Sequence, residues 1–333
     1  MQSTTAFLTV LVLGVIGVAV IAPETGSLSG LAVSAAARQT MSFNVVDAAA
    51  FGRLVATDAS VRKVAGGFQF VEGPVWMNAP GGGYLLFSDL RANELKRWDP
   101  SGGVTTFRAP SGTSNGNTVD REGRLVTAEH DGRVSRTEKD GTVVTVVDAF
   151  EGMKLSSPND VVFTSDGTMW FTDPEFGLGS RKKETPGNYV YRYSERDKTL
   201  RPVVTDMPTP NGLTFSPDES MLYVANSGKP PDIRAYPVTG SSSPFKGRVF
   251  ATIDQGIPDG IRCDELGNVW SSSGDGVQIF SPAGQLIGRI LLPESAANVA
   301  FGGPGGRTLF MTARTSVYAI DTLVRAATAA KGK

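Results

Sequence analysis

A short polar motif recurs five times along this chain, each time ahead of an apolar run with the composition of a β-strand. Every copy has an apolar residue four places after the polar one. The five polar residues are Glu72, Asn115, Asn159, Asn211 and Asp259. A sixth run, residues 297–301, keeps the same frame but has Ala297 at the polar position.

The steps between these six positions are 43, 44, 52, 48 and 38 residues. A repeat of about 40–50 residues has the length of one four-stranded propeller blade. In most copies a turn residue follows about eight places on, and a second apolar strand begins three residues later, as at Gly167 and Trp170. We therefore predict an all-β fold, a six-bladed β-propeller with four-stranded blades around a central channel.

The repeated polar residues also predict a common site. In a propeller the first strand of each blade lines the channel, so side chains far apart in sequence converge there. The five positions hold two acids and three amides, and neither His nor Cys. Such oxygen donors suit Ca²⁺ or Mg²⁺ better than a zinc site of thiolates and imidazoles. Glu72 and Asp259 together carry the charge that balances one divalent cation, and amide oxygens of Asn159 and Asn211 can complete the set.

Each polar-Gly pair is also, by itself, a turn signal, because Asn, Asp and Gly tolerate positive φ. A turn needs no fixed offset to a following apolar residue, yet the offset is the same in five units. Glu72 before Gly-Pro is moreover not a favoured turn residue. The pattern as a whole therefore favours a repeated site over five independent turns.

From about residue 61 to residue 320 the chain resembles the gluconolactonase, senescence marker protein (regucalcin) and luciferin-regenerating enzyme family of six-bladed propellers. Residues 117–136 are most similar to the bacterial gluconolactonase branch. The stretches that carry the resemblance most specifically are EGPVW (72–76), SPNDVVFTSDGTMWFTDPEFGL (157–178), PNGLTFSPDESMLYVANS (210–227) and PDGIRCDELGNVW (258–270). The resemblance implies one divalent cation at the channel floor, held by Glu72, Asn159, Asn211 and Asp259, the set that the repeat also selects.

The same resemblance implies hydrolysis of a small lactone of the sugar type. A cation in an open site polarises a carbonyl and stabilises the oxyanion that forms on attack. Asp259 is the expected catalytic residue, either as the base that positions and deprotonates water or as a direct nucleophile. Ca²⁺ is the expected cation from the hardness of the ligands, with Mg²⁺, Mn²⁺ and Zn²⁺ as alternatives.

Three further residues are candidates for substrate binding. Asn115 occupies the repeated position, and the alternatives for it are a supporting contact behind the ligands or a turn. His130, the only His in the chain, is predicted to end the second strand of blade two, and the alternative is an exposed loop residue. Asp173 either binds substrate, orients Asn159 or caps the adjacent loop.

Two other functions compete with the lactonase. One is a non-catalytic propeller that binds a carbohydrate or a protein partner around a structural cation, and the other is an arylesterase or organophosphate hydrolase. The absence of a G-x-S-x-G motif and the single His disfavour a serine triad. A net charge of −1 and no Lys/Arg clusters give no electrostatic footprint for nucleic acid. We expect a monomer with a small-molecule lactone as substrate.

The N-terminal part differs from the rest. Residues 6–22 are apolar and an A-x-A pattern ends at Ala37, so residues 1–37 are predicted as a signal peptide for export to the periplasm or the medium. Because no Lys or Arg precedes the apolar run, an uncleaved membrane anchor is the alternative. The remaining domain predictions are a linker (38–54), the propeller (55–325) and a C-terminal tail (326–333). Part of the segment before the first blade is predicted to pair with the last blade around residues 316–320, which closes the ring.

Overall fold

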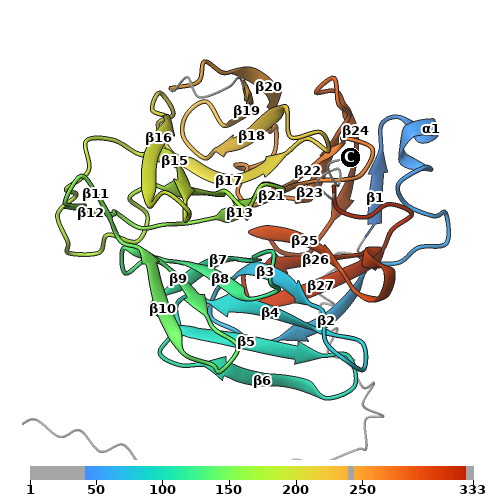
Figure 1. Cartoon of the computed structure of the whole chain (residues 1–333). Coiled ribbons are helices and arrows are strands. Elements are labelled where there is room, and N and C mark those ends of the chain that lie inside the picture. The colour runs from blue at the N-terminus through green and yellow to red at the C-terminus, as the bar shows by residue number, and fades with distance from the viewer. Residues whose placement is uncertain (1–41, 239–243, 328–333) are drawn as a thin grey trace, which may run out of the picture. The chain divides into compact units, whose positions relative to one another are not determined.

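The structure is a computed structural model that describes residues 42–238 and 244–327. Six antiparallel sheets lie around a common centre, with β3, β7, β13, β17, β21 and β25 innermost (Figure 1). Each of these inner strands contacts the inner strand of the next blade, and β25 contacts β3. The predicted six-bladed propeller is therefore confirmed.

The first three blades each consist of four strands that are consecutive in the chain. A two-stranded hairpin of β11 (Ala149–Phe150) and β12 (Met153–Lys154) lies between the second and the third of them. Blade one consists of β3 (Val71–Met77), β4 (Tyr84–Asp89), β5 (Glu94–Asp99) and β6 (Gly103–Arg108). Blade two consists of β7 (Ser114–Val119), β8 (Leu125–Glu129), β9 (Arg133–Thr137) and β10 (Val143–Val147). Blade three consists of β13 (Val161–Phe163), β14 (Met169–Asp173), β15 (Tyr189–Ser194) and β16 (Thr199–Val204).

The last two blades contain, in addition, strands from the N-terminal part of the chain. A short 3-10 helix, η1 (Pro304–Gly306), connects the first two strands of blade six. The strands of blades four to six are β17 (Pro210–Phe215), β18 (Met221–Asn226), β19 (Asp232–Pro237) and β20 (Arg248–Thr252); β21 (Ile261–Cys263), β22 (Val269–Ser273), β23 (Gly276–Phe280) and β24 (Leu286–Leu291); and β25 (Asn298–Gly302), β26 (Thr308–Ala313) and β27 (Ser316–Asp321).

The ring is closed by an N-terminal strand, β2 (Arg62–Gly66), which supplies the outer strand of blade six. It pairs antiparallel with β27, with Arg62 opposite Ala319 and Gly66 opposite Ser316. The chain then continues directly into the first blade, so blade six joins the two ends of the propeller. This confirms the predicted pairing and covers the edge that β27 would otherwise expose.

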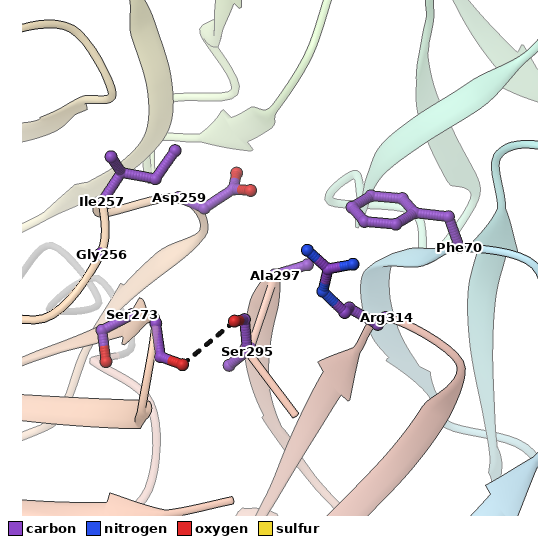
Figure 2. A pocket seen from close by; sticks show the side chains of 10 residues that line it. Phe70, Gly256, Ile257, Asp259, Ser273, Ser295, Ala297 and Arg314 are labelled. Atoms are coloured by element: carbon purple, nitrogen blue, oxygen red, sulfur yellow. Dashed lines mark hydrogen bonds between the residues drawn. The ribbon is translucent and has the colours of Figure 1, made fainter. Parts of the chain in front are cut away.

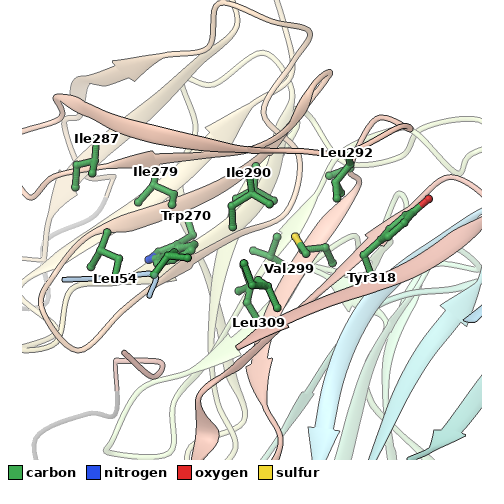
Figure 3. Packing of buried hydrophobic residues seen from close by; sticks show 14 of the residues in the cluster. Leu54, Trp270, Ile279, Ile287, Ile290, Leu292, Val299, Leu309 and Tyr318 are labelled. Carbon is green, nitrogen blue, oxygen red and sulfur yellow. The ribbon is translucent and has the colours of Figure 1, made fainter. Parts of the chain in front are cut away.

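Residues 42–54, predicted as a linker, instead contain β1 (Ser42–Val45) and α1 (Ala48–Phe51). β1 pairs with β24 as a fifth strand of blade five. Asp47 caps α1, because its Oδ1 accepts a hydrogen bond of 2.9 Å from the backbone N–H of Ala50. The segment is ordered because its apolar side chains are buried. Phe51 and Leu54 pack in a cluster with Trp270 of β22 and other residues of blades five and six (Figure 3).

The chain after the last blade also contacts blade five. The backbone N–H of Ala327 donates to the carbonyl of Cys263 at 2.8 Å, and Ala326 bridges to Asp264. The predicted signal or anchor segment (1–37) and residues 328–333 of the predicted tail lie outside the described residues. Among the residues that the structure describes, no helix is long and apolar enough to cross a membrane.

Candidate active site

The repeated polar residues lie at one end of the inner strands. Glu72, Asn115 and Asn211 are each the second residue of their strand, whereas Asn159 and Asp259 lie two residues before β13 and β21. In blades one, two and four the pairing register shifts at the motif itself. Such bulges turn a side chain out of the regular alternation of a strand, and here they accompany the residues at the channel.

The glycines of the motif mark close approach between blades rather than turns. Only Gly73 has a positive φ, of 49°. Backbone N–H groups of the other three donate to the next blade: Gly116 to Asn159 O (2.7 Å), Gly212 to Asp259 O (3.1 Å) and Gly260 to Ala297 O (2.8 Å). A Cβ at Gly73 would lie 1.9 Å from Asn115 O, so a larger residue does not fit there either.

This packing predicts a defined effect for a methyl group at Gly212. A Cβ there would lie 2.3 Å from Asp259 O, so Gly212→Ala must push the two blades apart. We expect a loss of about 1–3 kcal/mol in the free energy of unfolding, measured by urea denaturation. Gly102→Ala is the matched control, because the nearest atom to its added Cβ is Asp99 Cβ at 3.6 Å. Equal stability of the two variants would contradict the packing argument.

Four polar side chains from three blades contact one another at the channel. Asn115 Nδ2 donates to Asn159 Oδ1 at 2.6 Å and lies 2.9 Å from His130 Nε2, while His130 Nε2 is 3.2 Å from Asn159 Oδ1. Asn159 Nδ2 in turn donates to Asn211 Oδ1. Burial lowers the pKa of His130, which favours a neutral ring that accepts from Asn115. The structure thus brings Asn115, His130, Asn159 and Asn211 together.

The two predicted acidic ligands share an electrostatic environment. Burial raises the pKa of Glu72 to about 7, although hydrogen bonds from Asn298 and from the backbone of Gly73 oppose the shift. Burial also raises the pKa of Asp259 well above its ordinary value, and repulsion from Glu72 and Asp160 adds to this. Ionising both carboxyl groups is unfavourable while they are buried and repel each other. A cation bound between them would offset this repulsion and stabilise both as carboxylates.

Sequence reasoning missed Asn298, which stands in the sixth blade at the place that Gly occupies in most copies of the motif. Its Nδ2 donates to Glu72 Oε2 at 3.0 Å, and the backbone N–H of Gly73 donates to the same oxygen at 2.8 Å. Asn298 directly follows Ala297, so a polar residue was present in the sequence one position after the expected one. The side chain fixes one oxygen of Glu72 and leaves the other without a hydrogen bond from any described residue.

A partly buried ion pair between Asp160 and Arg262 was also not predicted. Arg262 Nη1 lies 2.9 Å from Asp160 Oδ2, and the pair links blade three to blade five. Asp160 stands at the place that Gly occupies in the other motifs, and its carboxylate acts electrostatically on both Glu72 and Asp259. The guanidinium therefore balances a third carboxylate close to the site.

Asp173, predicted to contact substrate, to orient Asn159 or to cap a loop, is fully buried. Its two oxygens accept hydrogen bonds from the backbone N–H groups of Ser156 (3.0 Å) and Ser157 (2.8 Å). Asp89 does the same for residues 69 and 70 in blade one. This geometry supports a role in holding the segment that leads into Asn159.

Asp259 lines a cavity of about 220 Å³. Its carboxyl group enters the cavity from one side, and Phe70 and Arg314 lie opposite (Figure 2). The cavity is smaller than the roughly 300–1,000 Å³ of pockets for drug-sized ligands, so it suits a small molecule.

The donors present fit a hard divalent cation. Asn115 Oδ1 is buried and accepts no hydrogen bond from the described part of the chain, which is unusual for an amide oxygen. Across residues 42–238 and 244–327, no three His, Cys, Asp or Glu side chains form a metal-binding group. The predicted ligand set does not require one, because it combines two carboxylates with two amides.

The family model for the SMP-30/Gluconolactonase/LRE-like region matches residues 70–315. A gluconolactonase from Zymomonas mobilis is 34% identical over 294 residues, covering 79% of this chain and 81% of its own length. The pentonolactonase XacC from Haloferax volcanii is 30% identical over 250 residues, covering 72% of this chain and 80% of its own. The solved structure of the Xanthomonas campestris gluconolactonase XC5397 is 33% identical with a TM-score of 0.79, and the match covers 84% of this chain and 94% of that one.

Proposed function

The chain belongs to the SMP-30/gluconolactonase/LRE-like family, and on that basis we propose that it hydrolyses sugar-type lactones with the help of one divalent cation. The similarity to lactone hydrolases, which act on a carboxylic ester, supports the reaction class. The observation that carries the proposal is the meeting of Asn115, His130, Asn159 and Asn211 beside two mutually repelling carboxyl groups, Glu72 and Asp259.

Glu72, Asn159, Asn211 and Asp259 would hold the cation, which we propose to be Ca²⁺. When bound, it supplies Lewis-acid polarisation of the lactone carbonyl and stabilisation of negative charge on its oxygen. Hydrogen bonds within the chain support this ligand set. Asn298 and the Gly73 N–H orient Glu72, and the contact between Asn159 and Asn211 fixes two amides relative to each other.

A role for Asp259 in activating water is supported by the position of its carboxyl group, which lines the cavity and lies within the anionic cluster. We propose that an Asp259 carboxylate oxygen takes a proton from water as the water oxygen bonds to the carbonyl carbon. The ring C–O bond then breaks, and Asp259 passes the proton that it took from water to the ring oxygen, which leaves as a hydroxyl group. The product is an open-chain hydroxy acid. Direct attack by Asp259 on the carbonyl carbon is the alternative.

Asn115 and His130 are proposed to bind hydroxyl groups of the substrate. His130 is only 5% exposed, and burial lowers its pKa, so the ring is neutral at physiological pH. A neutral ring can donate a hydrogen bond to a substrate hydroxyl group without forming an ion pair with the nearby carboxylates. The unpaired Asn115 Oδ1 is an acceptor that a hydroxyl group or a water molecule can satisfy.

Removal of the cation tests the proposal. Hydrolysis of gluconolactone releases acid, so a pH-indicator assay follows it directly. After chelation and dialysis we expect the rate to fall at least about 100-fold and to return with added Ca²⁺, because the polarising charge is worth several kcal/mol in the transition state. Protein dialysed without chelator is the control. A full rate in protein shown by elemental analysis to lack a cation would contradict the metal-dependent reaction, and sugar binding without turnover on any lactone would favour the non-catalytic alternative.

A further inference from the structure

Among the described residues, Arg314 is the one cationic side chain that lines the cavity beside Asp259. Figure 2 shows its guanidinium entering the cavity next to the ring of Phe70, on the side opposite Ile257. Within the described residues, this guanidinium makes no hydrogen bond or ion pair with any carboxylate. The neighbouring acid Glu294 is engaged elsewhere, with Thr315 and Tyr318.

The backbone that carries Arg314 is tightly held. Residues 314 and 315 form the turn between β26 and β27, and Arg314 has a φ of 41°. Its carbonyl accepts a hydrogen bond of 2.8 Å from Val71 N, and Thr315 O accepts from Gly67 N and Phe68 N at 3.1 and 3.2 Å. These contacts fix the direction in which the side chain leaves the turn.

A left-handed φ is unfavourable for Arg, and a turn of this kind normally takes Gly or Asn. A long charged side chain at such a position adds nothing to the turn itself, and it is exposed. An outlier of this sort at a cavity supports a functional reading of the residue. The place is equivalent to that of His130, since each follows directly on the second strand of its blade, after Glu129 in blade two and after Ala313 in blade six.

The rest of the cavity leaves a distinct role for this charge. Ser273 Oγ donates to Asp275 Oδ1 at 2.6 Å and Ser295 Oγ donates to Gly274 O at 3.0 Å, so both hydroxyl protons are engaged within the protein. Phe70 and Ile257 supply apolar surface. Arg314 is therefore the strongest free donor toward a ligand, and a planar guanidinium binds a carboxylate in a bidentate manner.

We infer that Arg314 selects lactones that carry a second, negatively charged group remote from the lactone carbonyl, such as the free carboxylate of an aldarolactone. This deepens the proposed function and rests on it. The carboxylate would pair with Arg314 at one side of the cavity while the lactone carbonyl lies at the Asp259 side. Neutral aldonolactones would enter the same cavity without this ion pair.

The test compares two substrates in the same pH-indicator assay: gluconolactone, which is neutral, and glucarolactone, which has a free carboxylate. We expect the wild type to have the higher kcat/KM for glucarolactone. Arg314→Gln should lower the ratio of the two kcat/KM values by roughly 10- to 100-fold, the range of a charge-assisted hydrogen bond. Arg314→Lys should retain part of the preference, and Arg196→Gln is the matched control at an exposed arginine whose side chain is 89% accessible.

An unchanged ratio in Arg314→Gln, or an equal loss on both lactones, would overturn the inference while leaving lactone hydrolysis intact. If the wild type hydrolyses neither lactone, the proposed function fails, and binding decides the inference separately. In that case calorimetric titration with glucarate and with gluconate should show a preference for glucarate that Arg314→Gln removes. The same affinity of both proteins for glucarate would overturn the role of Arg314.

Discussion

Asp259→Asn is expected to lower kcat/KM for gluconolactone by roughly 100- to 10,000-fold, the range over which a positioned base contributes to proton transfer. The amide keeps the shape of the carboxyl group but cannot accept a proton from water. It also removes one of the two charges that repel each other at the site, so the fold should not lose stability. The measurement is the initial rate by pH indicator, with thermal unfolding followed in parallel.

The cation content of the variant has to be measured, because Asp259 is also a proposed ligand. Asp197→Asn is the control, since this exposed carboxylate pairs at the surface with Arg196 and Ser194 and with no other residue that the structure describes. An Asp259→Asn protein that keeps both its cation and full activity would rule out the assignment of the base. A single turnover in ¹⁸O-labelled water adds a test for direct attack by Asp259, which an unlabelled product would establish.

Removal of β2 is expected to abolish cooperative thermal unfolding of the propeller. Without residues 62–66 blade six has three strands, and the edge of β27 is exposed along its length. The partly buried Val64 and Ala65 would also leave the cluster in which Trp76 and Phe310 stack at 5.4 Å between ring centroids. Loss of the strand therefore removes both the hydrogen-bonded closure and part of an apolar core.

A series of three chains separates this effect from that of the preceding elements. The first begins at Ser42 and contains every described element; the second begins at Ala59 and lacks β1 and α1; the third begins at Gly67 and also lacks β2. We expect the second to be less stable, because it loses the buried Phe51 and Leu54, but still to unfold cooperatively by calorimetry and near-UV circular dichroism. If the third chain melts like the second, closure by β2 does not stabilise the ring.

Much of the fold follows from one periodic feature of the sequence. A residue that must face the channel returns once per blade, and the apolar residue four places on, such as Phe163 or Phe215, is fixed by the strand that follows. The closing strand was predictable because the last strand of the last blade would otherwise present an unpaired edge. The fold of residues 42–54 was not, because a four-residue strand and a single helical turn carry too little pattern to separate them from a linker.

The site was predictable only where its residues follow the repeat. Asn298 was missed because it lies one position after the frame residue Ala297, at the place that Gly occupies in most copies of the motif. The Asp160–Arg262 pair could not be found in the sequence, because its members are 102 residues apart and neither has a local pattern. Arg314 is likewise an ordinary turn residue until the cavity is seen.

The contacts between successive blades have a consequence for how such a chain can change over evolution. Four of the six joints are glycine contacts, at Gly73, Gly116, Gly212 and Gly260, and the other two are amide contacts, from Asn159 to Asn211 and from Asn298 to Glu72. Duplicating or deleting one repeat unit, the simplest genetic change open to a repetitive gene, would therefore break the circle of neighbours at the channel. The contacts between blades at the channel therefore constrain the number of repeat units, whereas they place no such constraint on the loops at the rim.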